Sequence, residues 1–253
     1  MISCPACTSI KIVKNGFNAT GKQNHLCREC GRQFVLDPLV SEISEQTKSL
    51  IDRLLLERIS LAGIARAVNV SESWLQSYVN QKYQGVPRQL HVPRLSNFRL
   101  VVECDELWSF VLKKTEKQWV WIAKDRHSGY IVGLYSGARG IEGAQGLWNS
   151  LPRDYQELAN FYTDFWEAYA AVFPECHHDA VGKESGQTNH VERYNGTLRQ
   201  RISRLVRKAL SFSKKLENHM GAIWHFVHHY NSTEVSPFAL RHEVHKGRAE
   251  VCS

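Results

Sequence analysis

Four cysteines near the start of the chain have the spacing of a metal site. Two C-x-x-C pairs, Cys4-Pro5-Ala6-Cys7 and Cys27-Arg28-Glu29-Cys30, are separated by 19 residues. Four thiolates at this spacing can close tetrahedrally on one Zn²⁺ ion. A redox role for each pair is the alternative, but two matched pairs near one terminus favour structural zinc. We therefore expect residues 1–37 to form a zinc ribbon with short strands near residues 10–13 and 34–35.

Three acidic residues in the second half of the chain stand in segments where a carboxylate needs a partner. Asp105 lies inside a predicted strand, residues 98–111, that is rich in β-branched and aromatic side chains. A lone buried carboxylate is strongly destabilised, so Asp105 requires a partner such as a cation. Asp164 follows a predicted strand at 158–163, and Glu192 lies in a predicted helix over 188–209. At the border of the apolar stripe of that helix, Glu192 can point toward the other two acids.

Each of these acids also has a simpler interpretation. Asp105 could be an acid in a turn at the strand edge, Asp164 the N-cap of the next helix, and Glu192 one member of a surface ion pair. Glu106 competes with Asp105, but successive strand residues point to opposite faces, so only one of the two can reach the site. Glu103 shares the face of Asp105 and could contact the residues that bind the metal without binding it itself.

The order of the predicted elements places two of the acids on separate strands. Three sequential strands are expected at residues 98–111, 119–123 and 130–135, joined by polar turns. A helix at 141–150, the strand at 158–163 and a helix through Trp166, Tyr169 and Val172 follow. The order is therefore β-β-β-α-β-α, with acids on the first strand and at the end of the fourth.

Basic residues gather directly after Glu192. Between residues 193 and 215 there is no acidic residue, and eight are basic: Arg193, Arg199, Arg201, Arg204, Arg207, Lys208, Lys214 and Lys215. On a helix over 188–209 the residues that face away from the apolar stripe are Arg193, Arg201, Arg204 and Lys208, while Arg199 lies near Glu192. The chain has a net charge of +7 and a pI near 9.0. This distribution favours a polyanionic partner such as nucleic acid.

Residues 38–84 have the pattern of a helix-turn-helix. Leu61, Ile64 and Ala65 would face the core on a second helix, residues 68–70 would form the turn, and Ser71 would cap a third helix. The third helix would enter a major groove, with contacts from Ser71, Ser73 and Gln76. A helical bundle used only for packing is the alternative. Residues 85–97, with Pro87 and Pro93, are expected to be a linker.

Several motifs of the chain resemble those of one transposase family, the insertion-sequence-one family. The resemblance is carried by Asp105-Glu106-Leu107-Trp108-Ser109-Phe110, Thr163-Asp164-Phe165-Trp166 and the run Glu192-Arg193-Tyr194-Asn195-Gly196-Thr197-Leu198-Arg199-Gln200. It implies a DDE transposase with an α/β, ribonuclease H-like catalytic domain at 98–235 and a tail at 236–253. It also implies that the catalytic residues are Asp105, Asp164 and Glu192, followed by a basic residue at Arg199.

The chemistry implied by this resemblance is metal-dependent cleavage and joining of DNA. Two Mg²⁺ ions, which Mn²⁺ can replace, would bind the three carboxylates and activate water or a 3′-hydroxyl for attack on a phosphodiester. The expected DNA partners are the terminal inverted repeats of a mobile element and a target site. Because two ends must be handled, at least a dimer is expected.

Composition sets the remaining bounds. The chain has 253 residues, of which 43% are hydrophobic, and no apolar run approaches the roughly 20 residues of a membrane span. Seven cysteines and no evident signal segment favour reduced thiols and a cytosolic protein, close to the nucleoid of a prokaryote. A sequence-specific DNA-binding regulator and a nuclease of the same fold are the competing functions. The presence of all three acids argues against an inert regulator.

Overall fold

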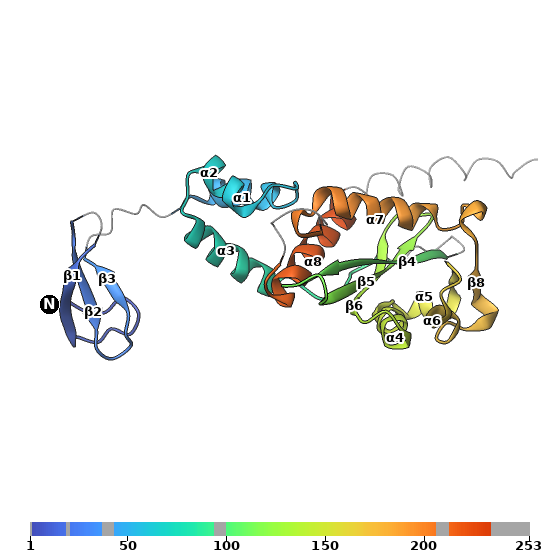
Figure 1. Ribbon diagram of the computed structural model, residues 1–253, viewed down its shortest axis with the longest axis horizontal. Helices are drawn as coiled ribbons and strands as arrows, with labels where there is room; N and C mark the ends of the chain where they lie inside the picture. Colours follow the sequence, from blue (N-terminus) through green and yellow to red (C-terminus); the bar gives the residue numbers. More distant parts are fainter. Residues whose placement is uncertain (1, 19–20, 37–42, 94–99, 206–212, 234–253) are drawn as a thin grey trace, which may run out of the picture. The chain divides into compact units, whose positions relative to one another are not determined.

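The computed structural model describes residues 2–18, 21–36, 43–93, 100–205 and 213–233 (Figure 1). The chain divides into two compact units, Met1–Lys48 and Ser49–Ser253. None of the helices in the described ranges has the length and apolar character needed to span a bilayer.

The first unit contains a small antiparallel sheet. Its strands, in the spatial order β1-β2-β3, are Ile12–Phe17, Gln23–Cys27 and Gln33–Val35. The turn after the second cysteine pair needs a glycine, because Gly31 has a φ of +73° and its N–H donates to the Cys27 carbonyl. Within the described residues of this sheet and its loops, the fully buried side chains are few: Cys4, Cys27 and His25. So small a core needs further support to hold its shape.

Three helices open the second part of the chain: α1 (Glu45–Leu54), α2 (Leu61–Val68) and α3 (Glu72–Gly85). Ser71 caps α3 by accepting from Trp74 N, as predicted, and Ser60 caps α2 in the same way by accepting from Gly63 N. The predicted turn at 68–70 is also confirmed, because Asn69 ends α2 in the left-handed conformation with a φ of 55°.

The five-stranded sheet of the second unit is mixed. In chain order its strands are β4 (Val101–Phe110), β5 (Lys117–Asp125), β6 (Ile131–Gly137), β7 (Asn160–Thr163) and β8 (His178–Ala180). Their spatial order is β6-β5-β4-β7-β8. The pairs β4–β5 and β5–β6 are antiparallel, whereas β7 runs parallel to β4 and β8 parallel to β7. The central strand is therefore β4, the strand that carries Asp105.

Helices cover both faces of this sheet (Figure 1). They are α4 (Ile141–Ser150), α5 (Arg153–Leu158), α6 (Glu167–Ala170), α7 (Asn189–Arg201) and α8 (Leu216–Thr233). Three 3₁₀ turns lie between them: η1 (Glu175–His177), η2 (Lys183–Ser185) and η3 (Ser203–Leu205). On one face Val102 and Cys104 share an apolar core with residues of α4 and α6. On the other face Leu107 belongs to a core with α7 and α8. The two-residue period of β4 thus assigns Glu103 and Asp105 to the α7 face and Glu106 to the α4 face.

Some element boundaries differ from the sequence-based prediction. The helix expected over 188–209 begins at Asn189 and ends at Arg201, because Ile202 leaves the helical conformation and is buried together with Leu205. Residues 206–209 lie outside the described ranges. The strand expected at 158–163 begins at Asn160, and β8 and α5 were not predicted. The expected linker begins inside α3, which extends to Gly85.

The first three helices and α8 share one apolar core. Ile51, Ile64, Leu75 and Val79 belong to the same cluster as Phe226. Where α3 and α8 pack together, a Cβ added to Gly221 would overlap the Cβ of Tyr83. The helices are therefore packed on the body that carries the sheet, and this packing depends on a glycine.

Gly221→Ala is expected to lower the free energy of unfolding by about 1–3 kcal/mol, because the new methyl group overlaps Tyr83. Gly196→Ala is the matched control, since it is also in a helix and its added Cβ meets nothing within 4 Å. There the change should be a small gain of up to about 1 kcal/mol. Thermal and urea denaturation of the two variants checks this, and equal stability of both would contradict the close packing.

Candidate active site and metal cluster

The three predicted acids meet at one pocket. It has a volume of about 380 Å³ and is lined by residues of β4, the end of β7, η2 and α7: Cys104, Asp105, Glu106, Leu107, Asp164, Lys183, Thr188, Glu192, Asn195, Gly196 and Arg199. The sheet supplies two acids because β4 and β7 are neighbours in it, and α7 crosses the face toward which Asp105 points. The structure thus brings together Asp105, Asp164, Glu192 and Arg199, four residues from separate parts of the sequence.

Asp105 is held by a single side chain of α7. Asn195 Nδ2 donates to Asp105 Oδ2 over 2.7 Å. Burial, reinforced by the nearby charges of Glu106 and Asp164, raises the pKa of Asp105 to about 7 from an ordinary value of 3.8. The charged form of this carboxylate is therefore costly, and a cation in the pocket would compensate it.

Glu106 points to the other face of the sheet and is already engaged. Arg139 donates to Glu106 Oε1 from Nε over 2.9 Å and lies 2.7 Å from it through Nη2. Tyr169 donates its hydroxyl to Glu106 Oε2 over 3.0 Å. Burial raises the pKa of Glu106 although these donors oppose the shift. Both oxygens of Glu106 thus have protein partners, one of them charged, whereas Asp105 accepts from the neutral amide of Asn195.

The other two acids make short local contacts. Asp164 Oδ1 accepts from Trp166 N over 3.0 Å, which fixes the turn between β7 and α6. Glu192 Oε1 accepts from the Thr188 hydroxyl over 3.0 Å at the start of α7. Among the described residues, only the four cysteines bring three or more ligand atoms within 4.8 Å of one another, so the three carboxylates are more widely spaced than the thiols.

Glu103 anchors α7 to the central strand. Its fully buried carboxylate accepts from the backbone N–H groups of His190 and Val191 over 2.8 and 3.0 Å. Arg126 Nε and His190 Nδ1 each lie 2.8 Å from its Oε1. A carboxylate at the first turn of a helix satisfies N–H groups that have no partner within the helix and complements its dipole. The start of α7 is therefore fixed two residues away from Asp105 on the same strand face.

Two cations border the pocket. Arg199, predicted from the resemblance, lines it and donates from Nη1 to the Trp108 carbonyl over 3.3 Å. Lys183 of η2 also lines it and was not predicted. Sequence reasoning missed Asn195 and Lys183 because a single amide and a single lysine in polar segments carry no spacing signal of their own.

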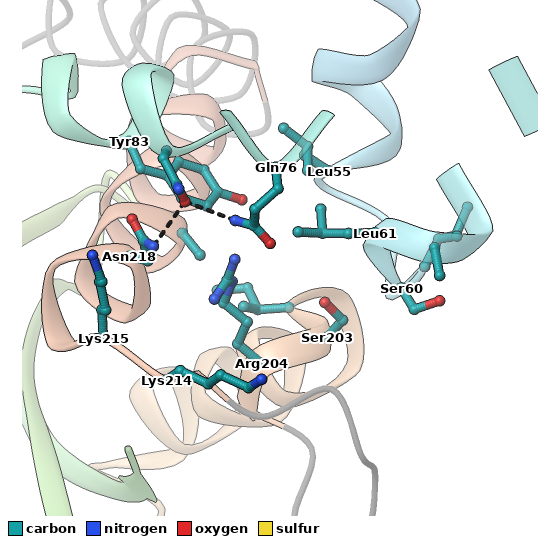
Figure 2. Close-up of a pocket in the computed structure, with 15 residues that line it drawn as sticks. Leu55, Ser60, Leu61, Gln76, Tyr83, Ser203, Arg204, Lys214, Lys215 and Asn218 are labelled. Atoms are coloured by element: carbon teal, nitrogen blue, oxygen red, sulfur yellow. Dashed lines mark hydrogen bonds between the residues drawn. The ribbon is translucent and has the colours of Figure 1, made fainter. Parts of the chain in front are cut away.

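Only some of the side chains predicted to form the basic face of α7 are exposed on that helix. Arg193 is exposed on the helix. Arg201 instead donates from Nε to the Leu56 carbonyl over 3.0 Å and from Nη2 to Glu57 over 2.9 Å. Arg204 lies beyond the end of α7 (Figure 2). It donates to the Ser213 hydroxyl over 3.1 Å. The expectation that both side chains point outward was wrong, because Arg201 is drawn to the loop after α1 and Arg204 follows the end of the helix. Arg207 and Lys208 lie outside the described residues.

The residues predicted to read DNA from the third helix lie at its start. Ser71, Ser73 and Gln76 are exposed on or next to α3. The Ser71 hydroxyl caps the helix, and Gln76 donates to Asn80 Oδ1 over 2.7 Å. Ser71 is thus engaged in a structural contact, while Ser73 and Gln76 are presented on the helix surface.

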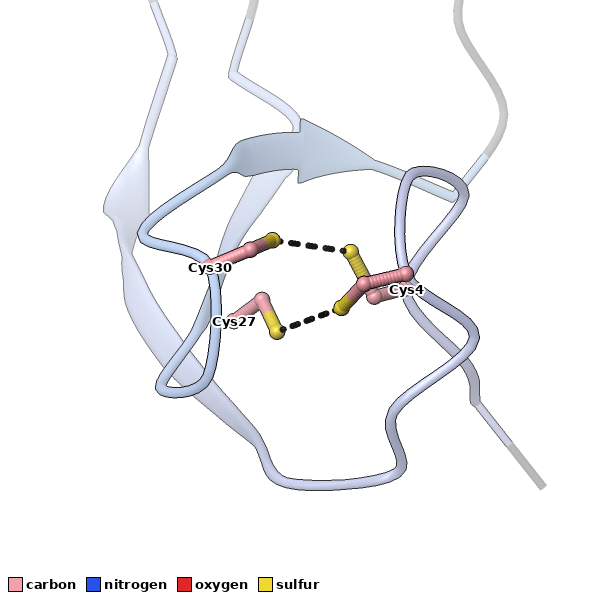
Figure 3. A group of neighbouring side chains, drawn as sticks. Cys4, Cys27 and Cys30 are labelled. Carbon is pink, nitrogen blue, oxygen red and sulfur yellow. Dashed lines mark hydrogen bonds between the residues drawn. The ribbon is translucent and has the colours of Figure 1, made fainter.

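The four cysteines of the first unit form a compact cluster (Figure 3). The Sγ atoms of Cys4 and Cys30 are 3.6 Å apart, as are those of Cys7 and Cys27, and all four residues are free thiols. Zn–S bonds of about 2.3 Å in a tetrahedron place sulfur atoms roughly 3.8 Å apart. The donor set and its spacing therefore fit one zinc ion and support the predicted zinc ribbon.

Comparison with known proteins finds a family model for each of the two parts of the chain. A family model described as "IS1 transposase" matches residues 99–232, and a model described as "InsA N-terminal domain" matches residues 1–31. The insertion element iso-IS1n protein InsB of Shigella dysenteriae is 34% identical over 128 residues, which are 51% of this chain and 94% of that protein.

Two further relatives give the same result. The insertion element IS1 protein InsB of Shigella flexneri is 34% identical over 130 residues, covering 51% of this chain and 95% of that protein. The insertion element IS1 4 protein InsB of Escherichia coli is 34% identical over 138 residues, covering 53% and 79%. The first family model spans the strands and helices that build the pocket, and the second spans the four cysteines. The chain belongs to the IS1 transposase family and is a transposase.

Proposed function

We propose that this transposase cuts and joins DNA strands with divalent ions held by Asp105, Asp164 and Glu192. The observation that carries the proposal is the meeting of these three carboxylates, from β4, the end of β7 and α7, in one pocket. Separate elements of the fold converge there on a set of hard oxygen ligands. Such ligands suit Mg²⁺, which Mn²⁺ can replace.

The electrostatics of the pocket fit a bound cation. Burial and the neighbouring acids raise the pKa of Asp105 to about 7, although Asn195 opposes the shift, so a cation beside this carboxylate would stabilise its charged form. When two ions are bound, they favour the deprotonated nucleophile and stabilise the leaving oxygen of an in-line displacement. Because each of two ions needs only some of the ligands, the carboxylates need not lie as close together as the cysteines do.

The chain's own residues orient the ligands and hold the DNA. Asn195 fixes the rotation of the Asp105 carboxylate, and Glu103 fixes the end of α7 from which Glu192 projects. Arg199 and Lys183 border the pocket and are suited to hold a phosphate. An arginine stays protonated, so Arg199 serves as a phosphate contact and not as an acid or base.

The topology supports a ribonuclease H-like fold for the proposed catalytic domain, residues 98–235. Three antiparallel strands are followed by two strands parallel to β4, which lies at the centre of the order β6-β5-β4-β7-β8. We further propose a zinc ribbon at 1–37, a linker at 85–97 and a tail at 236–253. The helix, turn and capped helix at α2–α3 support a helix-turn-helix within 38–84.

The proposed DNA partners are the terminal inverted repeats of the element and its target. Ser73 and Gln76 are suited to base contacts from α3, with Ser71 at its N-terminus. Arg193 and Arg199 would contact phosphates near the pocket, together with Arg207 and Lys208 farther along the chain. A transposase that joins two ends to one target would act as a dimer or larger assembly.

Asp105→Asn, Asp164→Asn and Glu192→Gln are each expected to reduce Mg²⁺-dependent cleavage on the order of 10³-fold, since a lost metal ligand removes several kcal/mol of transition-state stabilisation. Cleavage of a labelled duplex carrying the element's end is the measurement, with duplex binding measured in parallel. Glu142→Gln, an exposed acid outside the pocket, is the control. Cleavage by Asp164→Asn at the wild-type rate would contradict the assignment of the three carboxylates as the metal site.

Mg²⁺ and Mn²⁺ should raise the melting temperature of the full chain, because an ion that binds only the folded state stabilises it by mass action. The gain is about 2.7 kcal/mol at a hundredfold excess over the dissociation constant. Asp105→Asn should lose most of this increase, and Glu142→Gln should keep it. The same increase in both variants would show that the ions bind elsewhere.

Cys27→Ser is expected to abolish zinc binding and to weaken duplex binding several-fold, because the small first unit depends on the metal for its fold. Cys176→Ser is the matched control, since Cys176 is a free cysteine outside the cluster. Zinc content by mass spectrometry and duplex affinity by anisotropy are the readouts. Duplex affinity that is unchanged after zinc loss would assign the ribbon a role other than DNA recognition.

A further inference from the structure

A second pocket lies between the helical segment, which consists of α1, α2 and α3, and the body of the second unit, which carries the five-stranded sheet and α8 (Figure 2). Its volume is about 510 Å³, and its walls come from the end of α1, the start of α2, one side of α3, η3 and the start of α8. It shares no lining residue with the active-site pocket. The proposed catalytic chemistry therefore does not account for it.

The lining of this pocket is strongly cationic. Arg204, Lys214 and Lys215 all contribute to it, and in Figure 2 they project from the lower and left walls. Among the described residues that line it, none is acidic. In the described ranges, no carboxylate forms an ion pair with any of these three cations. The pocket thus concentrates positive charge that no acid in the described structure neutralises.

Arg204 is the least exposed of these three cations. Its guanidinium donates to the Ser213 hydroxyl and lies 5.6 Å from the centroid of the Tyr83 ring. Burial lowers the pKa of Arg204, although Tyr83 opposes the shift. Asp52, an acid close enough to act on Tyr83, already accepts from Tyr78 and Lys82. A partly desolvated guanidinium with only neutral partners is stabilised when an anion binds beside it.

The remaining polar groups of the pocket suit an oxyanion. Ser60, Leu61 and Ala62 line it, and they form the N-terminus of α2, where N–H groups lack partners within the helix and the helix dipole is positive. On the opposite wall Asn80 accepts from Gln76 over 2.7 Å and from Asn218 over 2.8 Å. These amides provide further hydrogen-bonding groups around the cations.

We infer that this pocket binds a phosphate group of the DNA backbone. The inference rests on the proposed binding of DNA by α2 and α3. Lys214 and Lys215 are exposed at the pocket, where a continuous polymer can reach them, and Gln76 belongs both to the pocket and to the α3 surface expected to face DNA. A phosphate bound here would contact α2, α3 and α8 together. It would therefore join the DNA contact of the helices to the body that carries the active site.

The double variant Lys214→Gln, Lys215→Gln tests this with little risk to folding, because both side chains are exposed. Binding of a fluorescent random-sequence duplex to the full chain is measured over a range of salt concentrations in Mg²⁺-free buffer. Each phosphate contact contributes about 0.9 to the slope of log affinity against log salt. The double variant should lose affinity several-fold, and its slope should be smaller by about 1 to 2. Arg204→Gln should act in the same direction.

Lys113→Gln, Lys114→Gln is the control, since it removes the same charge from exposed lysines outside the pocket. Equal salt slopes for the two double variants would overturn the inference. Titration with inorganic pyrophosphate separates the two sources of phosphate. Saturable pyrophosphate binding that requires Lys214 and Lys215, with an unchanged duplex slope, would reassign the pocket to a free phosphate compound and overturn the DNA assignment.

Cleavage of the element's end, measured separately with Mg²⁺, decides the proposed catalytic function. If only the Lys214→Gln, Lys215→Gln variant has a smaller salt slope and the wild type does not cleave, the phosphate pocket is supported and the carboxylate site is rejected. If the wild type cleaves and the two double variants have equal salt slopes, the carboxylate site is supported and the phosphate pocket is rejected.

Discussion

The geometry of the active-site pocket depends on the buried carboxylate of Glu103. This acid accepts from Arg126, from His190 through both its backbone and its ring, and from Val191. In a water-poor interior such charge-assisted bonds are strong, and the positive end of the helix dipole adds to them. Because strand residues alternate, the acid that anchors α7 and Asp105 project from the same face of β4. Because α7 is anchored at its first turn, its position relative to Asp105 is fixed.

The helical period carries this anchoring along α7. Glu192, Asn195 and Arg199 are spaced by three and four residues, so they lie on one side of the helix, toward the pocket. Val191 and Leu198 are buried and pack the same helix on the sheet. One buried acid and one apolar stripe thus position an acid, an amide and a cation together. The Asn195 amide donates to Asp105 and so links α7 to β4 within the pocket.

The sequence predicted much of this arrangement, because strand alternation and helix periodicity are local properties. The opposite orientation of Asp105 and Glu106 followed from the strand period alone, and the cap at Ser71 followed from residue type. The partners of these residues could not be predicted in this way. Arg139 reaches Glu106 from a segment 33 positions away, and no local pattern indicates the pairing.

The end of α7 shows a second limit of sequence reasoning. A helical projection over 188–209 assumes that the helix continues as long as its apolar stripe does. Ile202 keeps the stripe but leaves the helix, and the Arg201 carbonyl accepts instead from Arg58 N in the loop before α2. The apolar residue still becomes buried, in a different conformation. Tertiary contacts therefore decided the boundary, and with it the direction of the basic side chains that follow.

These same contacts change how the helical segment should be understood. Even with the proposed linker at 85–97, α3 is not free to move relative to the sheet, because α3 and α8 share an apolar core and Arg201 bonds to Leu56 and Glu57. Arg201 thus joins the loop after α1 to the end of α7. If α3 binds DNA, the position of that DNA relative to β4 is set by packing and not by linker length. The basic residues then have two tasks, since some attract phosphates and others fix the surface to which the phosphates come.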